Sequence, residues 1–291
     1  MKFALKYWWY TYKIMMRASG KMVVFFLIFI SVLSLLAGLG YNNFSPVFLL
    51  EVFLYAMLFE LVVFYGFFAI KTAVSIKDSC KFYEIVENKG YCMEAFDYFQ
   101  QTFILGKPVN EDKYIQFASL YCKFGDYDSA MSIMNSIQVP ESNIFLRSEY
   151  IYVFMKIAIY KKDTVLADNI WNSNQRFIDY VISENKHGEN INVLYLAMIY
   201  ADCIAGRDER AFKICDSFLK SEHMKKFSAY KEKFLVLKIY LLKKLEKEAE
   251  MNTAITEFNN YVSKKWKPLL EVNRTELRDC AKKAIRGELP V

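Results

Sequence analysis

The sequence contains very little histidine and none of the short motifs typical of common enzyme active sites. Its only histidines are His187 and His223. It contains no HExxH zinc motif, no GxSxG nucleophile motif, no P-loop and no GxGxxG dinucleotide motif. We therefore predict that the protein is not an enzyme and that it has no catalytic residues and no cofactor.

Metal-ligand spacing is also missing, and so is a strongly basic domain. All six cysteines follow residue 76, and no two of them form a CxxC pair, so we predict no metal site. The formal net charge is +6, but five basic residues and no acidic residue fall within residues 1–21. Because the rest of the chain is nearly balanced in charge, we expect no nucleic-acid partner.

Charged residues are almost absent between residues 22 and 70. Residues 22–39 are eighteen residues without a charge, close to the ~20 that span a bilayer as a helix. A second apolar run covers residues 46–70. A cleaved signal peptide is the alternative for the first run, but no A-x-A-like site follows it and a second span begins six residues later. We predict two uncleaved transmembrane helices within residues 22–75.

The basic residues indicate how this hairpin lies in the membrane. The connecting loop, residues 40–45, carries no basic residue, whereas Lys71, Lys77 and Lys81 follow the second span. The positive-inside rule then places the N-terminus and residues 76–291 in the cytoplasm. Lysine outnumbers arginine, and Asn, Ile, Phe and Tyr are frequent, which suggests a bacterial plasma membrane.

Residues 1–21 form a basic, aromatic segment next to the first span. Its basic residues recur at spacings that place them on one face of a helix, with Trp8 and Trp9 between them. One interpretation is a helix lying in the lipid headgroup layer, and the other is a charged flank without an ordered helix. The residues predicted to meet membrane lipids are Lys2, Lys6, Trp8, Trp9, Lys13 and Arg17.

Two acidic residues interrupt the second apolar run. Glu60 lies near its middle, where a charged carboxylate costs at least ~2.5 kcal/mol on insertion scales, and Glu51 lies nearer the outer end. In one interpretation, Glu60 contacts another membrane subunit or belongs to a proton path. In the other, it only forms a hydrogen bond with a nearby tyrosine. Both remain open from the sequence.

Low glycine and proline contents favour an all-α structure after residue 76. The stretch from 114 to 140, YIQFASLYCKFGDYDSAMSIMNSIQVP, resembles a tetratricopeptide repeat. The residues that match its pattern are Ala118, Tyr121, Gly125, Tyr127, Ala130 and Pro140. Small residues stand where the two helices of the repeat cross, and the glycine makes the turn between them.

Other segments repeat this pattern more weakly. The recurring small residues are Ala95, Ala130, Ala167, Ala211 and Ala249. They predict a transmembrane hairpin followed by a TPR-like solenoid of about five degenerate helical hairpins. A helical bundle whose alanines recur by chance is the alternative. Residues 275–286 are predicted to form a closing helix that Asn273 or Thr275 caps and Gly287 ends.

The resemblance implies a concave surface that binds a protein or peptide in the cytoplasm. On our register, this partner-binding face includes Glu84, Ser119, Lys156, Tyr200 and Lys238. Family members that clamp a C-terminal carboxylate use a lysine and asparagines at set positions. This chain lacks them in its first two units, so we do not expect it to bind chaperone tails.

Two functions follow from these features. The first is a membrane-anchored interaction or scaffold protein that presents its helical surface to a cytoplasmic partner. The second is a subunit of a membrane complex in which the transmembrane hairpin, with Glu60, is the functional element and another membrane subunit is the partner. Exchanging Glu60 for leucine separates them, because only the second function depends on that carboxylate.

Overall fold

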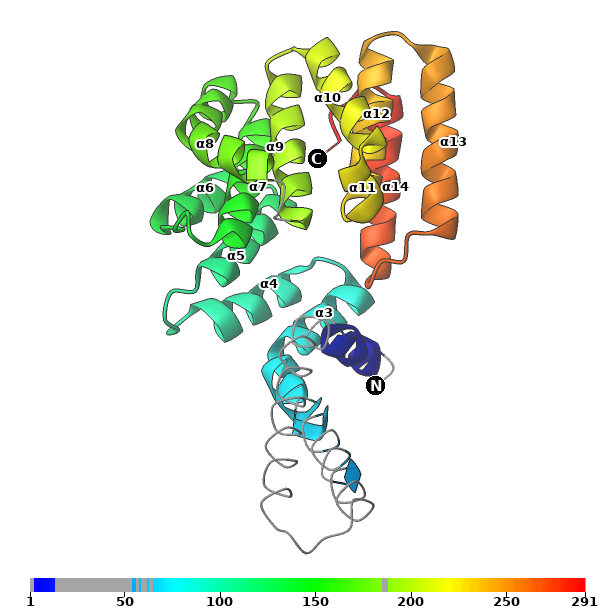
Figure 1. Ribbon diagram of the computed structural model, residues 1–291. Helices are drawn as coiled ribbons and strands as arrows, with labels where there is room; N and C mark the ends of the chain where they lie inside the picture. The colour runs from blue at the N-terminus through cyan, green and yellow to red at the C-terminus, as the bar shows by residue number, and fades with distance from the viewer. Residues whose placement is uncertain are drawn as a thin grey trace, which may run out of the picture. The chain divides into compact units, whose positions relative to one another are not determined.

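The computed structural model describes residues 3–13, 54–55, 58, 62, 65–67, 69–184 and 188–290. The chain forms two compact units, Met1–Asn88 and Lys89–Val291. Every regular element in the described ranges is a helix (Figure 1), which confirms the all-α prediction for these residues.

The first unit contains an ordered helix over residues 3–13, so the basic, aromatic segment is a helix in this part. It packs against the chain that leads into α3 (Lys77–Lys89). The Trp8 indole Nε1 donates to the carbonyl of Ala69 at 3.3 Å, and the Tyr7 and Tyr83 ring centroids are 5.2 Å apart.

The predicted membrane spans fall mainly on other residues. Residues 22–39 and most of 46–70, including Glu51 and Glu60, lie outside the described ranges. Within those ranges, no helix combines the length and the apolar character needed to cross a membrane.

The second unit is a succession of helix pairs that follow one another along the chain. Four pairs are α5 with α6, α7 with α8, α9 with α10, and α12 with α13, and α14 packs against α12. The elements are α4 (Met93–Phe99), the π-helix η1 (Gln100–Ile104), α5 (Glu111–Lys123), α6 (Tyr127–Ser136), α7 (Ile144–Lys161), α8 (Thr164–Glu184), α9 (Glu189–Ile204), α10 (Asp208–Lys220), α11 (Glu222–Lys226), α12 (Lys231–Lys244), α13 (Glu248–Lys264) and α14 (Glu271–Ile285).

Local capping explains several of the helix starts. The side chains of Asn110, Asp126 and Asn143 each accept a hydrogen bond from the backbone amide three residues later, which satisfies a donor that the helix leaves free. The predicted cap of the closing helix is wrong. α14 begins at Glu271, so Asn273 and Thr275 lie inside its first turns.

One turn geometry joins the two helices of all four pairs. A residue with positive φ follows the first helix, and the next amide donates to the carbonyl five residues before it, as in Asp126 to Tyr121 at 3.1 Å. This is the Schellman arrangement. The positive-φ residues are Gly125 (75°), Lys162 (54°), Gly206 (71°) and Glu246 (57°). The backbone therefore repeats even where the glycine does not.

Side-chain burial follows the same repeat. On the first helices, the residues matching Ala118 are Met155, Ile199 and Ile239, and all are fully buried. On the second helices, the fully buried small residues are Ala130, Ala167 and Ala211. These positions hold the interfaces where neighbouring helices approach most closely.

The prediction that Ala249 is the recurring small residue of the last pair is wrong. It is exposed, and the matching residue of α13 is Met251, whose amide donates to Lys247 as that of Ala130 donates to Asp126. A two-residue shift around a helix changes the face by ~200°, which accounts for the error.

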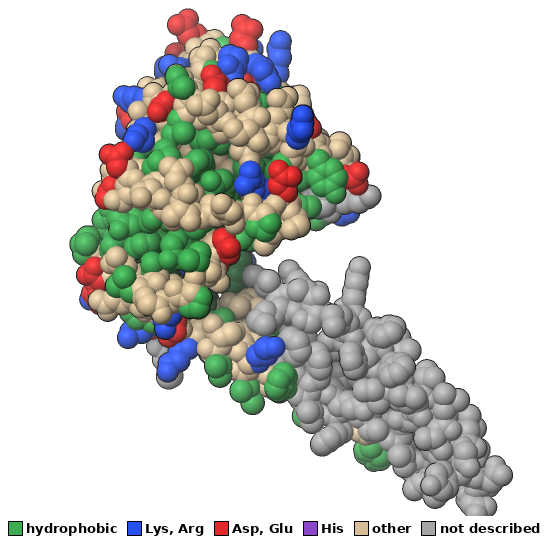
Figure 2. All heavy atoms as spheres, turned by 90° about the vertical axis from the view of Figure 1, so that its left-hand side faces the viewer, with side chains coloured by type: hydrophobic (Ala, Val, Ile, Leu, Met, Phe, Trp, Pro, Cys, Tyr) green, Lys and Arg blue, Asp and Glu red, His purple; other side chains and the backbone are tan. Residues whose placement is uncertain are grey.

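The charged side chains are mixed on the surface. In Figure 2, lysine and arginine alternate with aspartate and glutamate over the visible face of the second unit, with apolar side chains between them. Such interspersed charge differs from the basic face expected of a nucleic-acid-binding domain.

Candidate functional site

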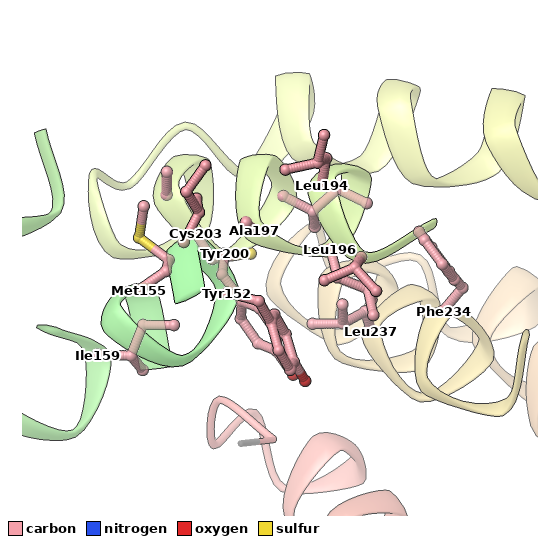
Figure 3. Packing of buried hydrophobic residues seen from close by; sticks show 14 of the residues in the cluster. Tyr152, Met155, Ile159, Leu194, Leu196, Ala197, Tyr200, Cys203, Phe234 and Leu237 are labelled. Atoms are coloured by element: carbon pink, nitrogen blue, oxygen red, sulfur yellow. The ribbon is translucent and has the colours of Figure 1, made fainter. Parts of the chain in front are cut away.

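A cavity of about 920 Å³ lies inside the second unit and is lined mainly by α5, α7, α12 and α14. Its size falls within the roughly 300–1,000 Å³ typical of small-ligand sites. Tyr152 of α7 and Tyr200 of α9 both line it. In Figure 3 their rings lie side by side, with a centroid separation of 6.3 Å, and their hydroxyl groups point the same way.

Tyrosine is prominent among the lining side chains. Burial raises the pKa of Tyr160, Tyr200 and Tyr230, so these phenols stay protonated and can donate hydrogen bonds at neutral pH. Together they offer apolar ring faces with polar edges, a surface that suits a peptide segment. The lining tyrosines are Tyr91, Tyr127, Tyr152, Tyr160, Tyr200 and Tyr230.

A buried ammonium lies on this aromatic wall. Lys233 Nζ donates to the Tyr152 hydroxyl at 3.1 Å and lies 5.0 Å from the Tyr230 ring centroid. The Tyr230 hydroxyl in turn donates to Glu149 Oε1 at 3.0 Å. Burial acts to lower the pKa of Lys233, but Tyr152, Glu149 and Glu232 together outweigh it and the pKa is raised. Lys233 therefore remains charged in the wall.

The C-terminal helix closes one side of the cavity. Lys123 at the end of α5 contacts both carboxylate oxygens of Glu276 on α14 at 2.6 Å. Leu277 and Cys280 of α14 also line the cavity. The last helix of the unit thus meets the first helix of the first complete pair across the cavity.

Lys123 and Lys233 each have a hydrogen-bonded side chain as partner, Glu276 and Tyr152. Lys156 has no such partner among the described residues. Its Nζ lies 5.8 Å from the ring centroids of both Tyr152 and Tyr160. Among the described residues, no carboxylate lies within ion-pairing distance of it. Glu149 acts on Lys156 electrostatically from beyond ion-pairing distance, so a lysine held over two aromatic faces in the cavity, with no directly paired carboxylate among the described residues, is suited to bind an anionic group.

The cavity offers no activated nucleophile. Its two cysteines are Cys122 and Cys280, and burial raises the pKa of both, that of Cys122 to about 11, so both stay as thiols. His223 lies elsewhere, with Nε2 3.1 Å from Asn192 Oδ1. In the part of the chain that the structure describes, no group of three histidine, cysteine or acidic residues is placed to hold a metal ion.

The structure brings together three of the five residues predicted for the partner-binding face. Ser119, Lys156 and Tyr200 all line the cavity. Lys238 points elsewhere and forms an ion pair with Asp216 at 2.9 Å. Glu84 belongs to α3 in the first unit.

The predicted membrane-surface residues lie partly within the described helix over residues 3–13. Trp9 is 49% exposed, Lys6 and Lys13 are exposed too, and Lys13 Nζ lies 4.8 Å from the Trp9 ring centroid. Trp8 instead packs inward against Ala69. The remaining two, Lys2 and Arg17, lie outside the described residues.

Sequence reasoning missed the part of the site that comes from distant segments. No local pattern marked Lys233, Tyr152 or the α14 residues as part of a site. Lysine and tyrosine are frequent in this chain, and most of them lie outside the cavity. The repeat register alone does not show that Lys233 faces the cavity. That also depends on how the successive helix pairs curve around it, which a sequence pattern does not describe.

No family model matches the chain, and no curated protein and no solved structure matches it.

Proposed function

We propose that this protein is a membrane-anchored interaction protein whose second unit is a TPR-like solenoid that binds a segment of a cytoplasmic partner protein in its cavity. The shared turn of the four helix pairs and the buried alanine in three of them support the TPR-like organisation. The uncharged run of residues 22–39 and the exposed Trp9 and Lys13 support the membrane attachment.

The observation that carries the proposal is Lys156. Its ammonium lies over the rings of Tyr152 and Tyr160 and forms no ion pair with a carboxylate of the described residues, which leaves a positive group at the cavity of about 920 Å³. A partner segment with an acidic side chain would neutralise this charge, and its backbone and apolar side chains would lie against the tyrosine rings.

A site-specific photo-crosslinker tests where the partner binds. Benzoylphenylalanine at Phe124, which lines the cavity, should crosslink a partner in cells that express the full chain. The same group at Val165, which is 68% exposed and outside the lining, should not. Equal products from both positions would contradict binding in the cavity.

Charge reversal tests the role of Lys156. Lys156→Glu should remove the crosslinked product, because it places a carboxylate where the acidic group binds. Lys213→Glu is the matched control, since Lys213 is exposed on α10 and does not line the cavity. If both variants behave alike, Lys156 does not contact the partner.

The membrane-subunit alternative rests on Glu60 alone. Glu60→Leu should leave the crosslink at Phe124 unchanged if the second unit carries the function. Loss of that product with normal amounts of the protein in the membrane would favour the subunit function instead.

A further inference from the structure

The chain turns sharply after α14 and contributes Pro290 to the wall of the cavity. Gly287, with a φ of 75°, ends the helix. The amides of Gly287 and Glu288 donate to the carbonyls of Ala284 and Lys283 at 3.0 Å each. These bonds complete the end of α14, and Pro290, three residues beyond Gly287, lies in the cavity lining.

The backbone of Pro290 is held at the cavity wall by a hydrogen bond from a lining side chain. The Tyr200 hydroxyl donates to its carbonyl at 2.7 Å, and this bond is buried. Leu289 packs against the hydrophobic core beside it. Because a buried hydroxyl needs a hydrogen-bond partner, the chain's own backbone here fills a place that a bound peptide could take.

The contacts of these two residues are few. The Tyr200 bond is the one hydrogen bond that the described structure gives to Leu289 and Pro290, and proline has no amide hydrogen to donate. The end of α14 does not depend on them, since its two capping amides belong to Gly287 and Glu288. Residues 289–290 can therefore leave their place at the cavity wall without unwinding the helix.

We infer that residues 289–290 are a resident occupant of the peptide site and that a partner segment binds by displacing them. The partner class follows from the contacts: an extended segment with a backbone carbonyl for Tyr200, an apolar side chain in the place of Leu289 and an acidic group for Lys156. The part about the partner rests on the proposed function, whereas the occupancy by the chain's own residues stands independently.

Tethering makes the resident segment an effective competitor. A short tether holds it at an effective concentration on the order of millimolar. A free peptide of the same sequence should therefore bind poorly until the resident residues are removed.

A labelled peptide, ELPV, with the sequence of residues 288–291, tests this competition by fluorescence anisotropy in detergent. It should bind a chain that stops after Glu288, which keeps both capping amides of α14. Its affinity for the full chain should be at least about tenfold weaker, because the tethered copy competes for the site. The reversed peptide, VPLE, is the control and should bind neither chain.

Two further variants guard against a shortened chain that does not fold. Leu289→Asp in the full-length chain should release the resident residues and restore peptide binding, because an aspartate does not pack against the core. Tyr200→Phe in the shortened chain should weaken peptide binding about fivefold, the effect of one neutral hydrogen bond.

The possible outcomes separate this inference from the proposed function. Equal binding of ELPV to the full and shortened chains, or no binding to either the shortened chain or Leu289→Asp, would overturn the inference. Peptide binding without any partner crosslink at Phe124 would sustain the inference and reject the proposed function. A partner crosslink of equal strength in the full and shortened chains would sustain the proposed function and reject the inference that residues 289–290 compete with the partner.

Discussion

Lys123 and Glu276 lie 153 residues apart in the sequence and form an ion pair at 2.6 Å. The pair joins α5 to α14 beside the cavity. Burial lowers the pKa of Lys123, and the attraction of Glu276 opposes this effect. The contact connects two helices between which three helix pairs intervene along the chain.

A double-mutant cycle of Lys123→Gln and Glu276→Gln should give a coupling energy of about 1 kcal/mol. We expect this modest value because the two side chains are 32% and 40% exposed, so solvent screens their attraction. Urea unfolding measures it. The exposed pair Lys282 and Asp279 on α14 is the control and should give less. A coupling no larger than the control would mean that the pair does not hold α14 in place.

The repeated turn predicts opposite effects of glycine at equivalent positions. Glu246→Gly should raise the free energy of unfolding by about 1 kcal/mol, because a residue other than glycine is strained at positive φ. Gly206→Ala should lower it by a similar amount, although open space surrounds that position. Thermal unfolding of both variants tests this, and a change of the same sign in both would contradict the shared geometry.

Burial raises the pKa of Glu232, which lines the cavity, above the usual value of 4.5. The folded state therefore holds this proton more strongly than the unfolded state. The resulting stability is present below the unfolded pKa and is lost as the pH rises through the folded pKa. Glu232→Gln should thus be more stable than the native chain at pH 7 and nearly equal to it at pH 4.

Chemical unfolding at both pH values measures this difference. Glu257→Gln, at an exposed position of α13 outside the cavity lining, is the matched control for the loss of a carboxylate. A Glu232→Gln variant with the same advantage at pH 4 and pH 7 would show that its effect does not come from ionisation.

Cysteine labelling tests the predicted membrane topology, with the native chain as the control. Asn42→Cys, in the loop between the two predicted spans, should react with an impermeant maleimide in intact cells. The native chain should not react, because all six cysteines follow residue 76 and are predicted to lie inside. Labelling of the native chain would reverse the orientation, and labelling of neither would argue against an exposed loop.

The repeat was predictable where local chemistry determines it. Gly125 and Gly206 stand at positive φ as a turn glycine should, and Ala130, Ala167 and Ala211 are buried as expected. The prediction failed at Ala249, because the matching position of α13 holds Met251 in place of a small residue and an exposed alanine lies two residues before it. Backbone hydrogen bonds impose the turn even without its preferred residue.

By itself, the sequence determined the helices, the approximate repeat and the grouping of Ser119, Lys156 and Tyr200 on one face. The helices depend on residues within a few turns of one another, and the grouping follows from the repeat register, which places equivalent residues of successive pairs on the same side. Only the tertiary structure decided that Lys123 meets Glu276 and that Tyr200 binds the carbonyl of Pro290. Such contacts depend on how successive pairs stack, which is the sum of many small packing angles that no local pattern records.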